Sequence, residues 1–317
     1  MKLGGHLRLT AFDEQSFSTS TMPSSRYAFC VRLFPDSVLT HLQGQYDKVV
    51  EFDIKSLSTS NQTAARVFQL RAQIAQGNFE EVLAELEGED EPELAAVKAL
   101  AKFNTEELEA ALEDIEKLAE TAPDNATVQI IGGIMLQRAG KTDEAIALLS
   151  NHQGSLEAVS IIVQIRLAQN RTDLALKEVS AAKKWAQDSL VINLAEAWAG
   201  LRVGGDKYQQ SYYVFEELAQ APSTSSTRSL VSQAVSELHL GRLEEAEVAL
   251  QQALEKDKTD IPALANKAVL TALGGGDISA DLLALKTEDS SHPMILDIAE
   301  KNELFDKAAS KYAAKVA

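Results

Sequence analysis

The residues best suited to nucleotide chemistry in this 317-residue chain are Gly140, Lys141 and Thr142. A glycine, a lysine and a hydroxyl residue in this order end the P-loop, whose backbone N–H groups and lysine hold phosphates. That loop needs another glycine five positions earlier, where this sequence has Met135. The triplet also follows a predicted helix, whereas a P-loop follows a strand. We therefore reject a nucleotide site here.

The other reactive residue types are scattered. None of the five histidines lies at metal-ligand spacing from another: His6, His41, His152, His239 and His292. Cys30 is the only cysteine, which excludes an internal disulfide and a cysteine-rich metal site. No serine lies in a G-x-S-x-G pattern, and the paired carboxylates fall on predicted exposed helix faces. The sequence thus predicts no catalytic, cofactor or metal site, and a protein that is not an enzyme.

Charge and hydropathy exclude two further classes. The formal net charge is −17 and no dense cluster of lysines and arginines occurs, so the surface repels phosphate backbones and nucleic-acid binding is not expected. No apolar run approaches the roughly 18 residues of a membrane span.

The apolar residues instead mark paired helices. Residues 230–255 predict two amphipathic helices around a turn at Gly241, because apolar residues recur every three or four positions on both sides. Ala246, five residues after the turn, lets the two backbones approach, and Leu250 fills the space between them. A pair this short cannot bury its own apolar face, so it needs copies beside it.

The copies are present along the chain. Each has a turn residue, then a bulky residue two positions on and a small or apolar residue five positions on. The turn residues are Gly44, Gly77, Gly140, Asn170, Asp206 and Gly241, with a weaker copy at Glu106. Their mean spacing of about 33 residues matches the tetratricopeptide repeat. We predict an all-α fold, a tetratricopeptide-like solenoid of helical hairpins over residues 35–317.

The two ends of the chain differ from this pattern. Residues 1–34 are rich in serine and threonine and poor in acids, and we predict a poorly ordered extension. A transit peptide and an aberrant gene start are the alternatives for this segment. Residues 290–317 should close the array as a terminal cap, with Phe305 and Tyr312 packed inward.

The most distinctive segment is GGDKYQQSYYVFEEL, residues 204–218. It resembles the GG-x-K-x-Q-x-AYY-x-F-x-E signature of the epsilon subunits of coatomer, with Ser211 where alanine is usual. Residues 154–166, 241–256 and 291–312 resemble further stretches of that family in the same order. The resemblance covers residues 35–317.

The resemblance implies a non-enzymatic subunit of the COPI vesicle coat. Such a subunit binds the C-terminal region of the alpha subunit of coatomer, and reaches the other coatomer subunits through it. It would support retrograde transport from Golgi to endoplasmic reticulum and within the Golgi. The implied location is cytoplasmic, on Golgi membranes and COPI-coated vesicles, with peripheral membrane association through the coat.

The first helix of each pair in such a solenoid lines the concave surface. We call inner stripes the positions ten, six and three residues before three of the turns. They are Val67, Arg71 and Ile74, then Ile130, Ile134 and Gln137, then Ser160, Gln164 and Leu167. Apolar side chains on a solvent-facing surface indicate a bound segment, so we expect these nine residues to contact the alpha subunit. The alternative is that some of them pack against the next repeat.

Two other functional classes remain open. A tetratricopeptide adaptor that clamps the carboxylate of another partner, such as a chaperone, needs converging basic residues, and only scattered candidates such as Arg71 and Arg138 occur. An enzyme with helical-repeat architecture needs clustered catalytic groups, which the sequence does not show.

Overall fold

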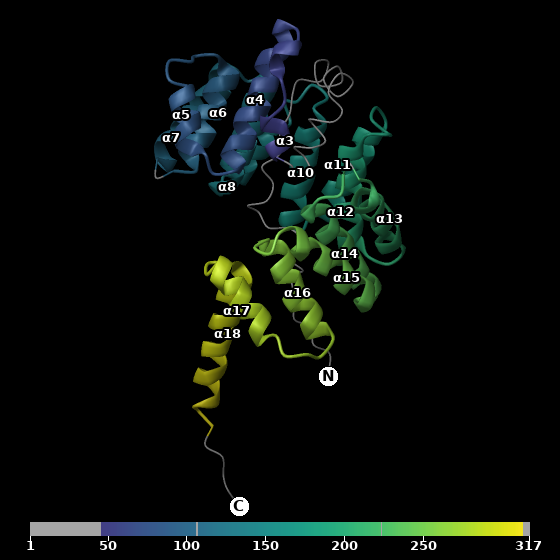
Figure 1. Ribbon diagram of the computed structural model, residues 1–317. Coiled ribbons are helices and arrows are strands. Elements are labelled where there is room, and N and C mark those ends of the chain that lie inside the picture. The colour runs from purple at the N-terminus through teal and green to yellow at the C-terminus, as the bar shows by residue number, and fades with distance from the viewer. Residues whose placement is uncertain (1–45, 106, 223, 313–317) are drawn as a thin grey trace, which may run out of the picture. The chain divides into compact units, whose positions relative to one another are not determined.

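The computed structural model describes residues 46–105, 107–222 and 224–312 (Figure 1). In these ranges the chain forms sixteen α-helices and one 3-10 helix and no strand, which confirms the all-helical prediction. The predicted extension at residues 1–34 and the turn at Gly44 lie outside the described residues. The elements are α3 Tyr46–Val50, η1 Ile54–Ser56, α4 Thr59–Ala75, α5 Phe79–Glu85, α6 Pro92–Phe103, α7 Leu108–Thr121, α8 Ala126–Arg138, α9 Thr142–Leu149, α10 Leu156–Ala168, α11 Thr172–Lys183, α12 Leu190–Val203, α13 Asp206–Gln220, α14 Thr227–Leu240, α15 Leu243–Lys256, α16 Ile261–Leu273, α17 Ser279–Glu288 and α18 Pro293–Ala309.

The helices from α4 to α17 form seven consecutive hairpins. The first helices of the hairpins begin 30 to 37 residues apart, as the repeat predicts. At three predicted turns the glycine has a positive φ: 88° at Gly77, 80° at Gly140 and 75° at Gly241. Asn170 takes the same role with a φ of 58°, a conformation that asparagine tolerates better than most residues.

Six of the hairpins bury the side chain at which the sequence predicts their closest approach. The side chains five positions after the predicted turns are almost completely buried: Val82, Ala111, Ala145, Ala175, Ser211 and Ala246. Five of these six are small, so the backbones of the two helices can approach closely.

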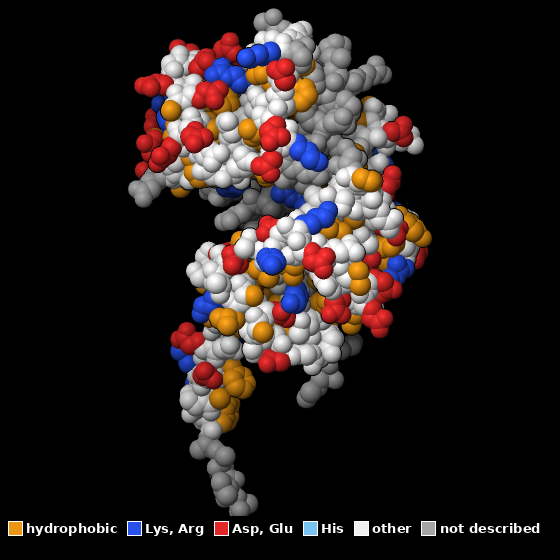
Figure 2. Space-filling model, in the orientation of Figure 1, with side chains coloured by type: hydrophobic (Ala, Val, Ile, Leu, Met, Phe, Trp, Pro, Cys, Tyr) orange, Lys and Arg blue, Asp and Glu red, His pale blue; other side chains and the backbone are white. Residues whose placement is uncertain are grey.

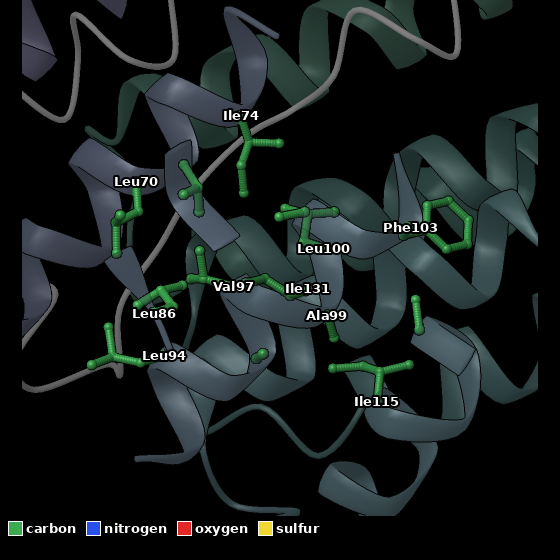
Figure 3. Close-up of a cluster of buried hydrophobic side chains, with 14 of the residues drawn as sticks. Leu70, Ile74, Leu86, Leu94, Val97, Ala99, Leu100, Phe103, Ile115 and Ile131 are labelled. Atoms are coloured by element: carbon green, nitrogen blue, oxygen red, sulfur yellow. The ribbon is translucent and has the colours of Figure 1, made fainter. Parts of the chain in front are cut away.

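The hydrophobic core is a series of clusters that neighbouring hairpins share. In the first cluster, Leu70 and Ile74 of α4 pack with Val97 and Leu100 of α6 and with Ile131 of α8 (Figure 3). Helix α8 is buried continuously from Ala126 to Leu136, because hairpins lie on both sides of it. The apolar faces of these first helices are therefore buried in contacts between neighbouring hairpins.

The chain divides into two compact units between Ser226 and Thr227. Among the described helices, α3 to α13 belong to one unit and α14 to α18 to the other. The division falls at the start of α14, directly after a short connecting loop. In the described residues, no helix combines the length and apolarity needed to cross a membrane.

The end of the array differs from the predicted cap. Phe305 is 71% exposed and Tyr312 is 82% exposed, so neither packs inward, and α18 has no buried residue. Met294 and Ile295, in the first turn of α18, pack against a cluster of α16 and α17. The physical reason is that α18 is the last described helix, so among the described residues no following helix covers its apolar side chains. Figure 2 shows hydrophobic side chains on its surface.

Candidate partner-binding face

The predicted inner stripes lie on three first helices, α4, α8 and α10, as expected from the turn positions. The structure buries most of their side chains. Val67, Arg71, Ile74, Ile130, Ile134, Ser160 and Leu167 are at most 8% exposed, and Gln137 and Gln164 are half-buried. The premise of an open apolar surface along these stripes is therefore wrong.

The apolar stripe residues pack against the following hairpin, which is the alternative that the sequence left open. On α4, Val67 and Ile74 belong to the cluster that contains Val97 and Leu100 of α6. Val67 and Ile74 therefore form part of the hydrophobic core between the first two hairpins.

The same packing occurs further along the array. Ile130 and Ile134 of α8 pack with Ile161 of α10, and Leu167 of α10 packs with Ala195 of α12. Partner binding by the nine residues stays a prediction, and it now depends on the polar members of the stripes.

Two of these polar members carry side-chain atoms without a hydrogen-bond partner among the described residues. They are Oε1 of Gln137 and Nε2 of Gln164, and both atoms are buried. Ser160 is different, because its hydroxyl donates to the carbonyl oxygen of Glu157 at 2.9 Å. Since buried polar atoms in proteins almost always have partners, the two amides are the best candidates for contact with a bound segment.

The fourth polar member, Arg71, lies against the carboxylate of Glu157, which is not among the predicted site residues. Nη2 of Arg71 is 3.5 Å from Oε1 of Glu157, and both side chains are fully buried. Burial lowers the pKa of Arg71, and the charge of Glu157 opposes that shift. The sequence spacing could have pointed to Glu157, because this residue lies one turn before Ser160 and so on the same face of α10. In the first turn of a helix, however, a glutamate is normally explained by the helix dipole.

This ion pair bears on the adaptor alternative. Arg71 is engaged with Glu157, so in this structure it is not offered to a partner's carboxylate. Arg138 donates to Oδ1 of Asn104 at 3.4 Å and is exposed. Among the described residues, histidine, cysteine and carboxylate side chains nowhere gather as three or more potential metal ligands.

The signature segment at residues 204–218 has a structural explanation. Gly204 and Gly205 both have positive φ, 82° and 60°, and turn the chain from α12 into α13. Phe215 is 1% exposed. Ser211 fits because Gly200 faces it, and its hydroxyl lies 2.9 Å from the carbonyl oxygens of Ala197 and Lys207.

The hairpin array defines a tetratricopeptide-like helical-repeat protein, and two solved structures share its fold. One is a tetratricopeptide repeat protein from Parabacteroides merdae, with a TM-score of 0.56 and 11% identity, covering 80% of this chain and 97% of that chain. The other is a chain of the APC/C hetero-tetramer Cut9–Hcn1, with a TM-score of 0.58 and 15% identity, covering 85% of this chain and 54% of that chain. At these identities the likeness concerns the fold alone.

The family is defined by sequence. The family model for the coatomer epsilon subunit matches residues 40–313. Coatomer subunit epsilon-1 of Arabidopsis thaliana is 32% identical over 248 residues, which cover 77% of this chain and 84% of that protein. The probable coatomer subunit epsilon of Schizosaccharomyces pombe is 29% identical over 273 residues, covering 85% and 91%. The chain belongs to the coatomer epsilon subunit family, a structural component of the COPI coat that associates with other coatomer subunits.

Proposed function

We propose that this coat subunit binds the C-terminal region of the alpha subunit of coatomer on the inner stripes of α8 and α10. Through this contact it supports retrograde transport from Golgi to endoplasmic reticulum and within the Golgi. Its place is then the cytosolic side of Golgi membranes and of COPI-coated vesicles, with peripheral association through the coat. Membership of the epsilon family over residues 40–313 is the observation that carries the proposal.

The two half-buried amides support the choice of this face. Gln137 and Gln164 lie on consecutive first helices, and each has a buried polar atom without a partner in the described part of the chain. Oε1 of Gln137 accepts and Nε2 of Gln164 donates, which are the two halves of a contact to a peptide backbone. Both atoms are buried, so a bound segment of the alpha subunit would pair with them after the side chains that cover them move aside.

The test is a calorimetric titration of the purified chain with the C-terminal region of the alpha subunit. The variant is Gln137→Ala with Gln164→Ala. A hydrogen bond is worth about 0.5–1.5 kcal/mol net, so loss of two should weaken binding about fivefold or more. Ile130 and Ile134 are unsuitable positions, because a carboxylate in that core would unfold the protein.

The matched control is Gln220→Ala, at an exposed glutamine on α13. It should leave the dissociation constant unchanged. If the double variant keeps its helical circular dichroism spectrum and binds as tightly as the control, the inner stripes are not the contact surface.

A further inference from the structure

Helix α18 carries large apolar side chains that no other described residue covers. Phe305 is 71% exposed, Tyr312 is 82% exposed and Leu304 is 55% exposed. Figure 2 shows hydrophobic side chains on this helix. Apolar side chains that are exposed singly are common on protein surfaces, whereas a contiguous set of them marks an interaction surface.

Four residues make the apolar face of α18 contiguous. They are Met294, Ile298, Phe305 and Tyr312, and we call them the α18 stripe. Steps of four, seven and seven positions keep them on one face of a helix. The turn continues past Ala309, because the backbone N–H of Tyr312 donates to the carbonyl oxygen of Ala309 at 3.0 Å. Met294 packs against the cluster of α16 and α17, so the stripe begins in a core and continues onto an exposed surface.

The residues that flank the α18 stripe are complementary to themselves in reverse order. Asp297, Leu304 and Lys311 follow one edge of the stripe, each seven positions from the next. If a second α18 packs antiparallel, with Leu304 against its own copy, Asp297 of each chain faces Lys311 of the other. On the other edge Asn302 faces its own copy, and an amide can both donate and accept a hydrogen bond. A parallel pair would keep the acidic and the basic ends apart.

Lys301 lies within the stripe, between Ile298 and Phe305, and forms an ion pair with Asp297. In the antiparallel pair its aliphatic stem lies against Phe305 of the other copy, while its ammonium group stays at the edge. A lysine at one core position of a helix pair lowers the stability of the pair and fixes its register. The α18 stripe therefore fits a weak contact of defined register.

We propose that α18 is a self-association surface, on which a second copy of this chain packs antiparallel through the α18 stripe. The rings of Phe305 and Tyr312 from both copies, together with Leu304, bury on the order of 1,000 Å². This area is at the lower limit for a specific interface, so we expect a dissociation constant in the micromolar range. A coat holds many copies close together, which favours a weak contact of this kind.

Sedimentation velocity of the full chain, from about 1 to 200 μM, covers the micromolar range in which the dimer is expected. The wild type should pass from monomer to dimer over this range. Phe305→Asp should remain monomeric, because it places a carboxylate from each copy in the apolar contact. Leu296→Asp is the matched control: Leu296 is 56% exposed and lies nine positions before Phe305, which is two and a half turns and so the opposite side of α18. This control should dimerise as the wild type does.

Reversal of single charges tests the antiparallel register. Asp297→Lys and Lys311→Asp each place like charges opposite one another in a homodimer, so each should weaken association at least fivefold. An equimolar mixture of the two variants pairs Lys with Asp at both ends and should associate about as tightly as the wild type. Helix α18 has no buried residue, so these variants should keep the wild-type circular dichroism spectrum.

Three outcomes would overturn the proposal. The wild type could remain monomeric at the highest concentration, or Phe305→Asp could associate as tightly as the wild type. The mixture of the two charge variants could associate no better than either variant alone, which would refute antiparallel pairing of Asp297 with Lys311. If the wild type is monomeric and Phe305→Asp instead weakens binding of the alpha C-terminal region, the α18 stripe is a surface for that partner and not for a second copy.

Discussion

The contact between Gly200 of α12 and Ser211 of α13 offers a quantitative test of how the hairpins pack. A Cβ atom built on Gly200 would lie 2.6 Å from Oγ of Ser211, closer than van der Waals contact permits. The next nearest atoms, the carbonyl oxygen and Cβ of Lys207, would lie at 3.5 and 3.6 Å, which is ordinary contact. The serine hydroxyl is therefore the one obstacle to a methyl group at this position.

The expected magnitudes follow from this geometry. Overpacking a core by one methyl group costs about 1–3 kcal/mol, while alanine is better than glycine in a helix by about 1 kcal/mol. Gly200→Ala alone should thus be neutral to destabilising by about 2 kcal/mol. Ser211→Ala alone should cost about 1 kcal/mol, the net worth of its hydrogen bond. In the double variant the obstacle is gone, so stability should return to within about 0.5 kcal/mol of wild type.

Urea unfolding of the four proteins forms a double-mutant cycle. We expect a favourable coupling of about 1 kcal/mol or more between the two alanines. Additive free energies, or a Gly200→Ala variant more stable than the wild type, would refute the close approach of the two helices.

Three further predictions test other parts of the account. Ala246→Leu should destabilise by roughly 1–3 kcal/mol, because Ala246 is fully buried between α14 and α15, and an unchanged urea midpoint would contradict the repeat register. Phe305→Ala should change stability by less than about 0.5 kcal/mol, since that ring is 71% exposed, whereas Phe215→Ala should cost about 3–5 kcal/mol; equal losses would restore the terminal cap. Burial lowers the pKa of His152, whose Nδ1 accepts from the backbone N–H of Gly154 at 3.1 Å. Its contribution to stability should therefore be lost as pH falls below about 6.5, and an NMR titration midpoint at or above 6.5 would contradict this.

The sequence predicted the local part of the fold well. Turn residues such as Gly77 and Asn170 act within a few positions of themselves, so their spacing alone locates the hairpins. The small residue five positions on is likewise a local requirement, which Ala145 and Ala246 satisfy. These features repeat in each copy, and repetition makes a weak local signal reliable.

Contacts between hairpins could not be predicted in the same way. Position on a helix shows that Ile130 faces inward, but it does not show that α10 covers it. The ion pair joins Arg71 and Glu157, which lie 86 positions apart in the chain, and no periodic pattern encodes it. The prediction that Phe305 packs inward is wrong for the opposite reason. The apolar spacing around Phe305 is typical of a packed helix, but the described residues contain no neighbour that covers it. Amphipathic spacing specifies which face is apolar, and the rest of the fold decides whether anything covers that face.

The most direct test of the central claim is a cross-link from the inner stripe in the assembled coat. The photoreactive residue p-benzoylphenylalanine is placed at Gln164 or, as a control, at the exposed Gln220, and cross-linked proteins are identified by mass spectrometry. We expect a product with the C-terminal region of the alpha subunit from position 164 and none from position 220. A product from position 220 alone, or no product from position 164 in a coat that contains the chain, would contradict binding on this face.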